Sequence, residues 1–382
     1  MGTGPSSSPL LSAVLIVRDE ARFLGGCLES LHGVVDEVVV VDTGSVDATV
    51  EIARRHGAKV VHHPWRDDFA EARNVSLDAA SGAWILYIDA DERLVEGDRR
   101  HVEELLTDAE EVAFRILLRP KVGTTPYREY RLWRNDPRIR FVGVIHEKVV
   151  PAITAVAAED GRPIGLGALV LQHLGYEGDQ SAKHARNLPL LRRQLAVEPG
   201  NLFAWNHLGR ILEALGEPDE AERAYEQAID VARSSSRGGP MDPLACLSYG
   251  DLIRLRRDRG ADAAELLDEA LGVFPGNCVL LLQEARLRMD RGDYAGALEP
   301  LDRILAFDWA TDPGDPPAYD AAIVGELPWA SRALCLFRLG RFADAAAAYD
   351  EAARCAPDDP SYPVKAGLAR GRAGRAAAAP AD

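Results

Sequence analysis

Two aspartates stand one residue apart, Asp89 and Asp91, directly after a short apolar run at residues 84–88. Such a run is typical of a strand covered on both faces, and ligands of open α/β sheets bind at the carboxyl ends of these strands. Because side chains alternate along an extended chain, both carboxylates point the same way and can share a divalent cation with a phosphate-bearing ligand. A lone pair of this kind also caps helices, so its meaning depends on the rest of the chain.

Strands and helices alternate upstream of this pair. Apolar runs at residues 12–17, 36–41 and 58–61 predict three further strands, and residues 67–80 have the pattern of an amphipathic helix. This alternation predicts a mostly parallel sheet in an α/β domain. Downstream, residues 112–118 and 127–133 have the pattern of antiparallel strands that wall an acceptor site, and residues 168–171 that of a last strand.

Several common motifs are absent from the sequence. The first strand is followed by Arg18-Asp19-Glu20 instead of the glycine fingerprint of a dinucleotide-binding domain. The chain also has no Gly-x-Ser-x-Gly nucleophile elbow and no Gly-x-x-x-x-Gly-Lys-Ser/Thr phosphate loop. These absences argue against a dehydrogenase, a hydrolase and a P-loop nucleotidase, and they leave the acids at the strand ends as the candidates.

The composition narrows the class of partner and the compartment. A net charge of −16 over 382 residues argues against nucleic acid and anionic membranes as partners. No apolar run approaches the ~20 residues that span a bilayer, and the N-terminal residues lack the basic start of a signal peptide. The five cysteines include no Cys-x-x-Cys pair and indicate neither a disulfide framework nor a zinc site, so we expect a cytoplasmic protein.

Four sequence blocks resemble, in their order along the chain, the family 2 glycosyltransferases with the GT-A nucleotide-sugar fold, over residues 12–176. They are Val14-Leu15-Ile16-Val17-Arg18-Asp19-Glu20, Val40-Val41-Asp42-Thr43-Gly44-Ser45 with Asp47, Asp67-Asp68-Phe69 with Ala72-Arg73-Asn74, and Asp89-Ala90-Asp91-Glu92. The resemblance implies that Asp42 contacts the nucleobase or ribose and that Arg73 and Asp89 hold the nucleotide, with Arg18 and Glu20 as further candidates. It also implies that Asp91 binds the divalent metal. Many relatives carry two acids where this chain has Asp42-Thr43, which leaves the base-reading role to Asp42 alone.

The chemistry of these residue types suits a nucleoside diphosphate. Mn²⁺ or Mg²⁺ prefers carboxylate and phosphate oxygens and neutralises the charge of the diphosphate as the glycosidic bond breaks. Asp42 can accept a hydrogen bond from a ribose hydroxyl or a uracil N–H, and Arg73 can donate two to a phosphate. The alternative role of Arg73 is an ion pair with Asp67 or Glu71 on its own helix.

Candidate groups for the transfer itself follow further along the chain. Residues 131–135 and 141–147 resemble the acceptor half of the same family. An inverting transfer needs a base for the acceptor proton, and Glu147 is the best-placed carboxylate, with His146 beside it. No second histidine follows at the spacing of a zinc protease, and His146 can equally be a core residue. The resemblance also implies a histidine in the metal shell near the end of the domain, which makes His173 the second metal-ligand candidate, with a plain strand-end histidine as the alternative.

From residue 201 on the chain repeats. The first copy has the small and large residues at the spacing that resembles a tetratricopeptide repeat: Trp205, Leu208, Gly209, Leu212, Ala221, Tyr225 and Ala228. Three further copies follow up to Pro357, with insertions at residues 234–242 and 307–327. A solenoid of such helix pairs offers a groove for a peptide or a surface for self-association, or it serves as a rigid prop.

We therefore expect an α/β GT-A-like domain followed by an all-α repeat solenoid. The expected boundaries are a disordered leader at 1–11, the transferase domain at 12–178, a helical linker at 179–200, the repeats at 201–370 and a flexible tail at 371–382. The leading hypothesis is an inverting, metal-dependent glycosyltransferase that moves a sugar from a UDP-type donor. The acceptor is a peptide or protein that the repeats recruit, and the sugar is linked through sulfur or oxygen. The repeats are also a candidate surface for a homodimer. The alternatives are a transferase for a cell-surface polysaccharide or lipid-linked sugar, and a repeat scaffold with an inactive transferase domain.

Overall fold

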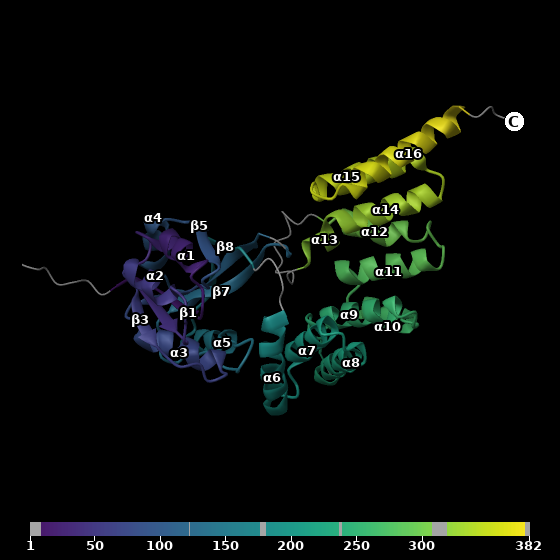
Figure 1. Cartoon of the computed structure of the whole chain (residues 1–382). Helices are drawn as coiled ribbons and strands as arrows, with labels where there is room; N and C mark the ends of the chain where they lie inside the picture. The colour runs from purple at the N-terminus through teal and green to yellow at the C-terminus, as the bar shows by residue number, and fades with distance from the viewer. Residues whose placement is uncertain (1–8, 122, 176–180, 237–238, 308–318, 379–382) are drawn as a thin grey trace, which may run out of the picture. The chain divides into compact units, whose positions relative to one another are not determined.

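The computed structural model describes residues 9–121, 123–175, 181–236, 239–307 and 319–378, and these fall into two compact units (Figure 1). The first unit holds the residues up to 121 and residues 126–199, and the second holds residues 123–125 and those from 200 on. The expected leader and the insertion at 307–327 lie largely outside the described residues. No helix within the described ranges is long and apolar enough to cross a membrane.

The first unit is built on one mixed sheet in the order β3-β2-β1-β4-β7-β6-β8-β5. Its strands are β1 Leu11–Val17, β2 Glu37–Asp42, β3 Lys59–His62, β4 Trp84–Tyr87, β5 Glu92–Glu96, β6 Ala113–Pro120, β7 Tyr127–Arg134 and β8 Ile164–His173. β1 to β4 pair in parallel, and β7 joins β4 antiparallel, which confirms the α/β prediction. β5 was missed, and β8 is longer than the strand expected at 168–171.

Helices cover both faces of this sheet (Figure 1). The helices of the unit are α1 Leu24–Leu31, α2 Thr49–Arg55, α3 Phe69–Ala79, α4 Arg99–Leu106, α5 Val150–Asp160 and α6 Ser181–Val197. Alternate residues of β4 explain the arrangement, because Trp84 and Leu86 pack with α1 and α4 while Ile85 packs with α3 and α5. The run at residues 84–88 is apolar throughout because each face meets a helical layer.

The strand register brings the candidate acids to one edge. Val17 pairs with Asp42 at the carboxyl ends of β1 and β2, and β4 runs parallel to β1 with its own carboxyl end at the same edge. In the last two strands of the sheet order, Glu92 of β5 pairs with His173 of β8. The topology therefore gathers residues that lie more than eighty positions apart in the sequence.

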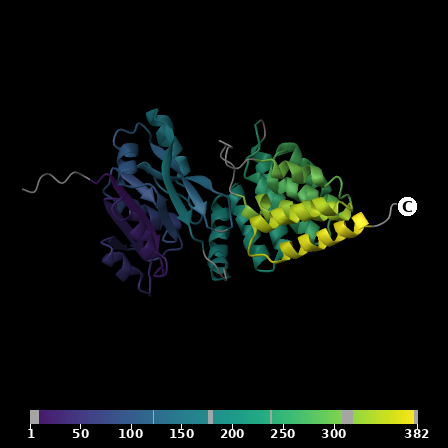
Figure 2. The same ribbon diagram turned by 90° about the horizontal axis from the view of Figure 1, so that it is seen from above.

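The second unit is a stack of helix pairs, as the repeats predict. Its helices are α7 Leu202–Ala214, α8 Pro218–Ser235, α9 Ala245–Asp258, α10 Ala264–Val273, α11 Cys278–Asp290, α12 Leu298–Leu305, α13 Ala321–Val324, α14 Glu326–Arg338, α15 Phe342–Cys355 and α16 Ser361–Ala378. In the first pair, Gly209 of α7 lies so close to Tyr225 of α8 that an added Cβ would be 2.4 Å from the ring. Figure 2 shows α15 and α16, in yellow, side by side.

Two expected boundaries differ from the structure. The flexible tail expected from residue 371 is helical up to Ala378, because its alanines and arginines are strong helix formers that extend α16. The segment at 179–200 is helical, as expected of the linker, but its helix α6 belongs to the first unit.

Candidate functional site

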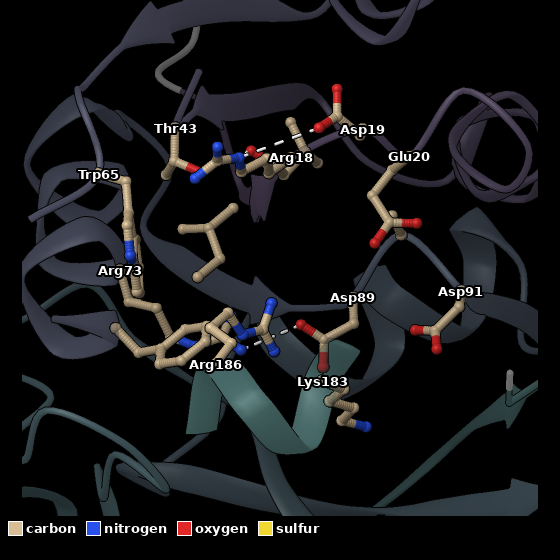
Figure 3. A pocket seen from close by; sticks show the side chains of 14 residues that line it. Arg18, Asp19, Glu20, Thr43, Trp65, Arg73, Asp89, Asp91, Lys183 and Arg186 are labelled. Carbon is tan, nitrogen blue, oxygen red and sulfur yellow. Dashed lines mark hydrogen bonds and ion pairs between the residues drawn. The ribbon is translucent and has the colours of Figure 1, made fainter. Parts of the chain in front are cut away.

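A pocket of about 720 Å³ opens at the carboxyl edge of β1, β2 and β4 (Figure 3). Of the residues predicted from the sequence, Arg18, Glu20, Arg73, Asp89 and Asp91 line it. The remaining lining residues are Ile16, Val17, Asp19, Thr43, Trp65, Phe69, Ala90, Lys183 and Arg186. The wall thus carries both cations and carboxylates, as a site for a charged ligand requires.

The loops after β1 and β2 are tied to each other. Asp19 has a positive φ of 55° and receives the backbone N–H of Val46 on its Oδ1 at 2.7 Å. The backbone N–H of Asp19 in turn donates to Ser45 Oγ at 3.0 Å, and that of Glu20 donates to Thr49 Oγ1 at 2.8 Å. These bonds fix the direction in which Arg18 and Glu20 leave the strand.

Asp42 lies beside the pocket and does not line it. Its side chain is buried, with Oδ1 accepting the Ser45 N–H at 3.0 Å and Oδ2 3.2 Å from His62 Nδ1. The next residue, Thr43, lines the wall instead. Recognition of the base or ribose by Asp42 stays a prediction.

Arg73 is the buried centre of the site. Its Nη2 donates to Asp89 Oδ1 at 3.1 Å, and its Nε donates to Glu147 Oε1. The alternative of an ion pair on its own helix is wrong, because Glu71 pairs with Arg66 at 3.0 Å and lies 3.5 Å from His63. Arg73 therefore links Asp89, after β4, to Glu147, before α5.

A second arginine, missed from the sequence, completes this network. Arg131 of β7 donates to Glu92 Oε1 at 3.0 Å, and the guanidinium carbons of Arg73 and Arg131 each lie over the Tyr87 ring, 4.1 Å from its centroid. Burial raises the pKa of Asp89, but the two arginines outweigh it and hold that pKa at about 2. Asp89 is thus a fixed anion. The charges that alternate along β7, in Tyr-Arg-Glu-Tyr-Arg, are the sequence signal for this role.

Asp91 and His173 form the candidate metal site. His173 Nε2 is 3.6 Å from Asp91 Oδ2, and His173 Nδ1 is 3.7 Å from Glu92 Oε1. The nearby Glu92 carboxylate and the charge of Asp91 raise the pKa of His173, whereas burial raises that of Asp91. No group of three or more His, Cys, Asp or Glu side chains suited to a metal ion occurs in the described ranges. Two protein ligands fit an ion such as Mg²⁺, which takes its other ligands from phosphates and water.

Glu147 and His146 lie behind the wall of the pocket. The Glu147 side chain is 10% exposed and its carboxylate is held by Arg73. His146 has a positive φ of 50°, and burial lowers the pKa of its imidazole. The carboxylates that line the pocket are Asp19, Glu20, Asp89 and Asp91. The role of Glu147 as the base stays a prediction.

Part of the opposite wall was not predicted from the sequence. Lys183 and Arg186 come from α6, which we expected to be a linker. Trp65 and Phe69 form an edge-to-face aromatic pair with ring centroids 4.7 Å apart. Flat apolar rings of this kind suit the face of a nucleobase or a sugar.

Comparison with protein families gives two matches. Residues 12–155 match the model of glycosyl transferase family 2. Residues 202–235 and 327–359 match the model of the tetratricopeptide repeat. The two matches fall in the first and the second unit, respectively.

Curated proteins with similar sequences include transferases and a repeat protein. A TPR repeat-containing protein of Synechococcus elongatus is 37% identical over 230 residues, which cover 58% of this chain and 57% of that protein. The SPbeta prophage-derived glycosyltransferase SunS of Bacillus subtilis is 26% identical, with 60% and 55% covered. The lipopolysaccharide core biosynthesis glycosyltransferase LpsC of Rhizobium meliloti is 33% identical, with 42% and 64% covered. The chain therefore spans between 55% and 64% of the length of these relatives.

Solved structures with some likeness fall into two groups. The Cut9–Hcn1 hetero-tetramer of the APC/C has a TM-score of 0.41 at 17% identity, covering 50% of this chain and 34% of that one. Glucosyl-3-phosphoglycerate synthase of Mycobacterium tuberculosis has a TM-score of 0.34 at 20% identity, covering 49% and 79%.

Proposed function

Because the chain joins a family 2 glycosyl transferase domain to tetratricopeptide repeats, we propose that it transfers a sugar from a nucleoside diphosphate sugar of the UDP type, with inversion at the anomeric carbon. The observation that carries this proposal is the pocket at the carboxyl edge of the sheet, where Asp89 and Asp91 meet Arg18 and Arg73. A nucleoside diphosphate carries negative charge, which these cations attract, and hydroxyl groups that can donate hydrogen bonds to the carboxylates.

Mn²⁺ or Mg²⁺ is the cofactor that these residues support. Asp91 and His173 would hold the ion, and its charge would offset that of the diphosphate as the leaving group departs. Arg73 and Arg131 keep Asp89 ionised. The Asp89 carboxylate in turn holds the Arg73 guanidinium at the pocket wall, where this guanidinium can donate to a phosphate oxygen. The aromatic pair Trp65 and Phe69 would exclude water from one side.

The acceptor has to lose a proton to a carboxylate on the face opposite the leaving group. Glu147 is the carboxylate that the sequence suggests as this base. Because Arg73 donates to it, Glu147 can also have a second role, which is to position that arginine. Glu20 lines the pocket itself and is the second candidate.

We further propose that the repeats recruit a peptide or protein acceptor for transfer to sulfur or oxygen. Tetratricopeptide stacks present long concave faces that suit an extended peptide. The likeness to LpsC, whose name places it in lipopolysaccharide core biosynthesis, favours a second candidate, a saccharide acceptor. A panel of peptides and oligosaccharides tested with the same donor would separate these two.

The first experiment is a donor screen that needs no acceptor. The full chain is incubated with UDP-, GDP- and dTDP-sugars with Mn²⁺, Mg²⁺ or EDTA, and release of nucleoside diphosphate is measured. We expect slow hydrolysis of one UDP-sugar that stops in EDTA. Proton NMR of the sugar at early times should show the anomer opposite to that of the donor. No release and no nucleotide binding under any condition would contradict the proposal and favour an inactive scaffold.

A further inference from the structure

Helix α6 closes one side of the pocket, although the matched family domain ends before it. The helix is anchored to the first unit through its second half. Gln194 Oε1 accepts the backbone N–H of Val144 at 2.8 Å, and Arg193 Nη2 lies 3.7 Å from Asp68 Oδ2. Leu190 and Leu191 are buried. These contacts hold α6 against the first unit.

The first half of α6 presents two cations to the pocket. Lys183 and Arg186 are three residues apart, so they lie on one face of the helix, and both line the cavity. The guanidinium of Arg186 lies over the Phe69 ring, 5.4 Å from its centroid. Figure 3 shows both side chains on the side of the pocket opposite Arg18 and Asp19.

Lys183 differs from Arg73 and Arg18, which also line the pocket, because these two arginines have carboxylate partners. Arg73 is paired with Asp89 and Glu147, and Arg18 lies 3.9 Å from Asp19. For Lys183, no hydrogen bond or ion pair occurs with any described residue, although it is near enough to Asp91 for their charges to interact. A solvated ammonium at the rim of such a pocket is available to an anionic ligand.

We propose that Lys183 and Arg186 bind the diphosphate of the sugar nucleotide and stabilise it as the leaving group. This inference rests on the proposed function and adds a cationic contact from outside the family domain. When the bond from the anomeric carbon to the β-phosphate oxygen breaks, the electron pair stays on that oxygen and the sugar carbon bonds to the acceptor. The ammonium and guanidinium donate hydrogen bonds to the phosphate oxygens, on which the negative charge grows.

The test is calorimetric titration of the full-length protein with UDP and with UMP, each with Mn²⁺. We compare the wild type with Lys183→Gln, Arg186→Gln and the double variant. Each single substitution should weaken UDP binding by about tenfold, as expected for one charge-assisted hydrogen bond. Binding of UMP, which has no β-phosphate, should change much less.

The matched control is Arg192→Gln, which removes the same charge from an exposed position of α6 outside the pocket. Equal UDP affinity in Lys183→Gln and Arg192→Gln, with a wild type that binds UDP, would overturn the inference and leave the proposed function standing. Equal losses for UDP and UMP would also overturn it, because a general disturbance of the pocket acts on both. A wild type that binds no UDP, GDP, ADP or dTDP and consumes no sugar nucleotide would overturn the proposed function as well.

Discussion

At the scale of single residues, Asp89 and Asp91 differ in environment although only Ala90 separates them. Asp89 is engaged by Arg73, Arg131 and the Tyr87 hydroxyl, and its charge is fixed by them. Asp91 faces His173 and the pocket. We infer that Asp89 positions the arginines while Asp91 is the residue available to a metal ion.

The first prediction concerns Asp91→Asn. The variant should lose metal-dependent hydrolysis of the donor, because a neutral amide is a much poorer ligand for a hard cation than a carboxylate. Circular dichroism and the thermal midpoint should match the wild type, since the amide has the shape of the carboxylate and burial already disfavours the charge of Asp91. Calorimetric titration with Mn²⁺ in the presence of UDP measures the loss directly. Wild-type rates that still require metal would contradict the assignment.

A second prediction compares Glu147→Gln with Glu20→Gln. Because Glu147 pairs with the buried Arg73, its substitution should lower the free energy of unfolding by about 1–3 kcal/mol and weaken UDP binding. Glu20 lines the pocket, so its substitution should spare stability and, if it is the base, slow transfer by about 10²–10⁴. Transfer slowed in Glu147→Gln with UDP affinity intact would instead assign the base to Glu147.

At the scale of elements, the sequence pattern predicted the strands and helices that form from their own local residues. The strands β1 to β4 were predictable because each is a short apolar run, and the acids after them were predictable from their spacing. The strand β5 was not, because Glu-Arg-Leu-Val-Glu becomes a strand only by pairing with the distant β8. Arg131 and Lys183 were missed for the same reason: they reach the site through the order of strands and the packing of α6.

A third prediction concerns the hydrogen bonds that Asp36 accepts at the start of β1. Asp36 accepts the backbone N–H groups of Leu10 and Leu11, both at 2.9 Å, and pairs with Arg99 of α4. Burial raises the pKa of Asp36, but Arg99 and the two backbone donors lower it by more. The pKa of Asp36 therefore lies below its ordinary value of 3.8. Asp36→Asn should therefore lower the free energy of unfolding by about 1 kcal/mol near neutral pH.

The pH dependence of that difference follows from the sign of the shift. A carboxyl with a lowered pKa stabilises the fold above its ordinary pKa, and this stabilisation is lost as the pH falls through the folded-state value. The difference in unfolding free energy between wild type and Asp36→Asn in urea denaturation should be complete well above the ordinary pKa of 3.8 and should disappear as the pH falls through the lower folded-state pKa. Asp108→Asn, at an exposed position, serves as the control. A gap that grows with acidity would refute the account.

The fourth prediction uses two helix glycines of the repeats. A Cβ at Gly209 would lie 2.4 Å from the Tyr225 ring, so Gly209→Ala should destabilise the second unit by about 1–3 kcal/mol through overpacking. A Cβ at Gly272 of α10 meets no atom within 4 Å. Gly272→Ala should therefore stabilise by about 0.5–1 kcal/mol, because alanine is the better helix former. Thermal unfolding followed by far-UV circular dichroism measures both, and equal effects would contradict the close packing.

At the scale of the whole molecule, the proposed donor site lies in one unit. Arg18, Arg73, Asp89 and Asp91 all belong to the first unit, and so do Lys183 and Arg186. Within the described part of the repeats, no residue lines this pocket. Donor binding and acceptor selection should therefore be separable, with the division at residues 199–200 and not at the end of the sheet.

The last prediction follows from that division. A fragment ending at Pro199 keeps α6 and should bind UDP with Mn²⁺ as the full chain does, whereas a fragment ending at Tyr176 loses Lys183 and Arg186 and should bind UDP more weakly. The longer fragment should also lose transfer to a peptide acceptor, because it lacks the repeats to which we assign acceptor recruitment. Calorimetry on both fragments, with a transfer assay beside it, measures the two effects separately. Full transfer by the longer fragment would refute acceptor recruitment by the repeats, and equal UDP affinity of two folded fragments would refute the role of α6.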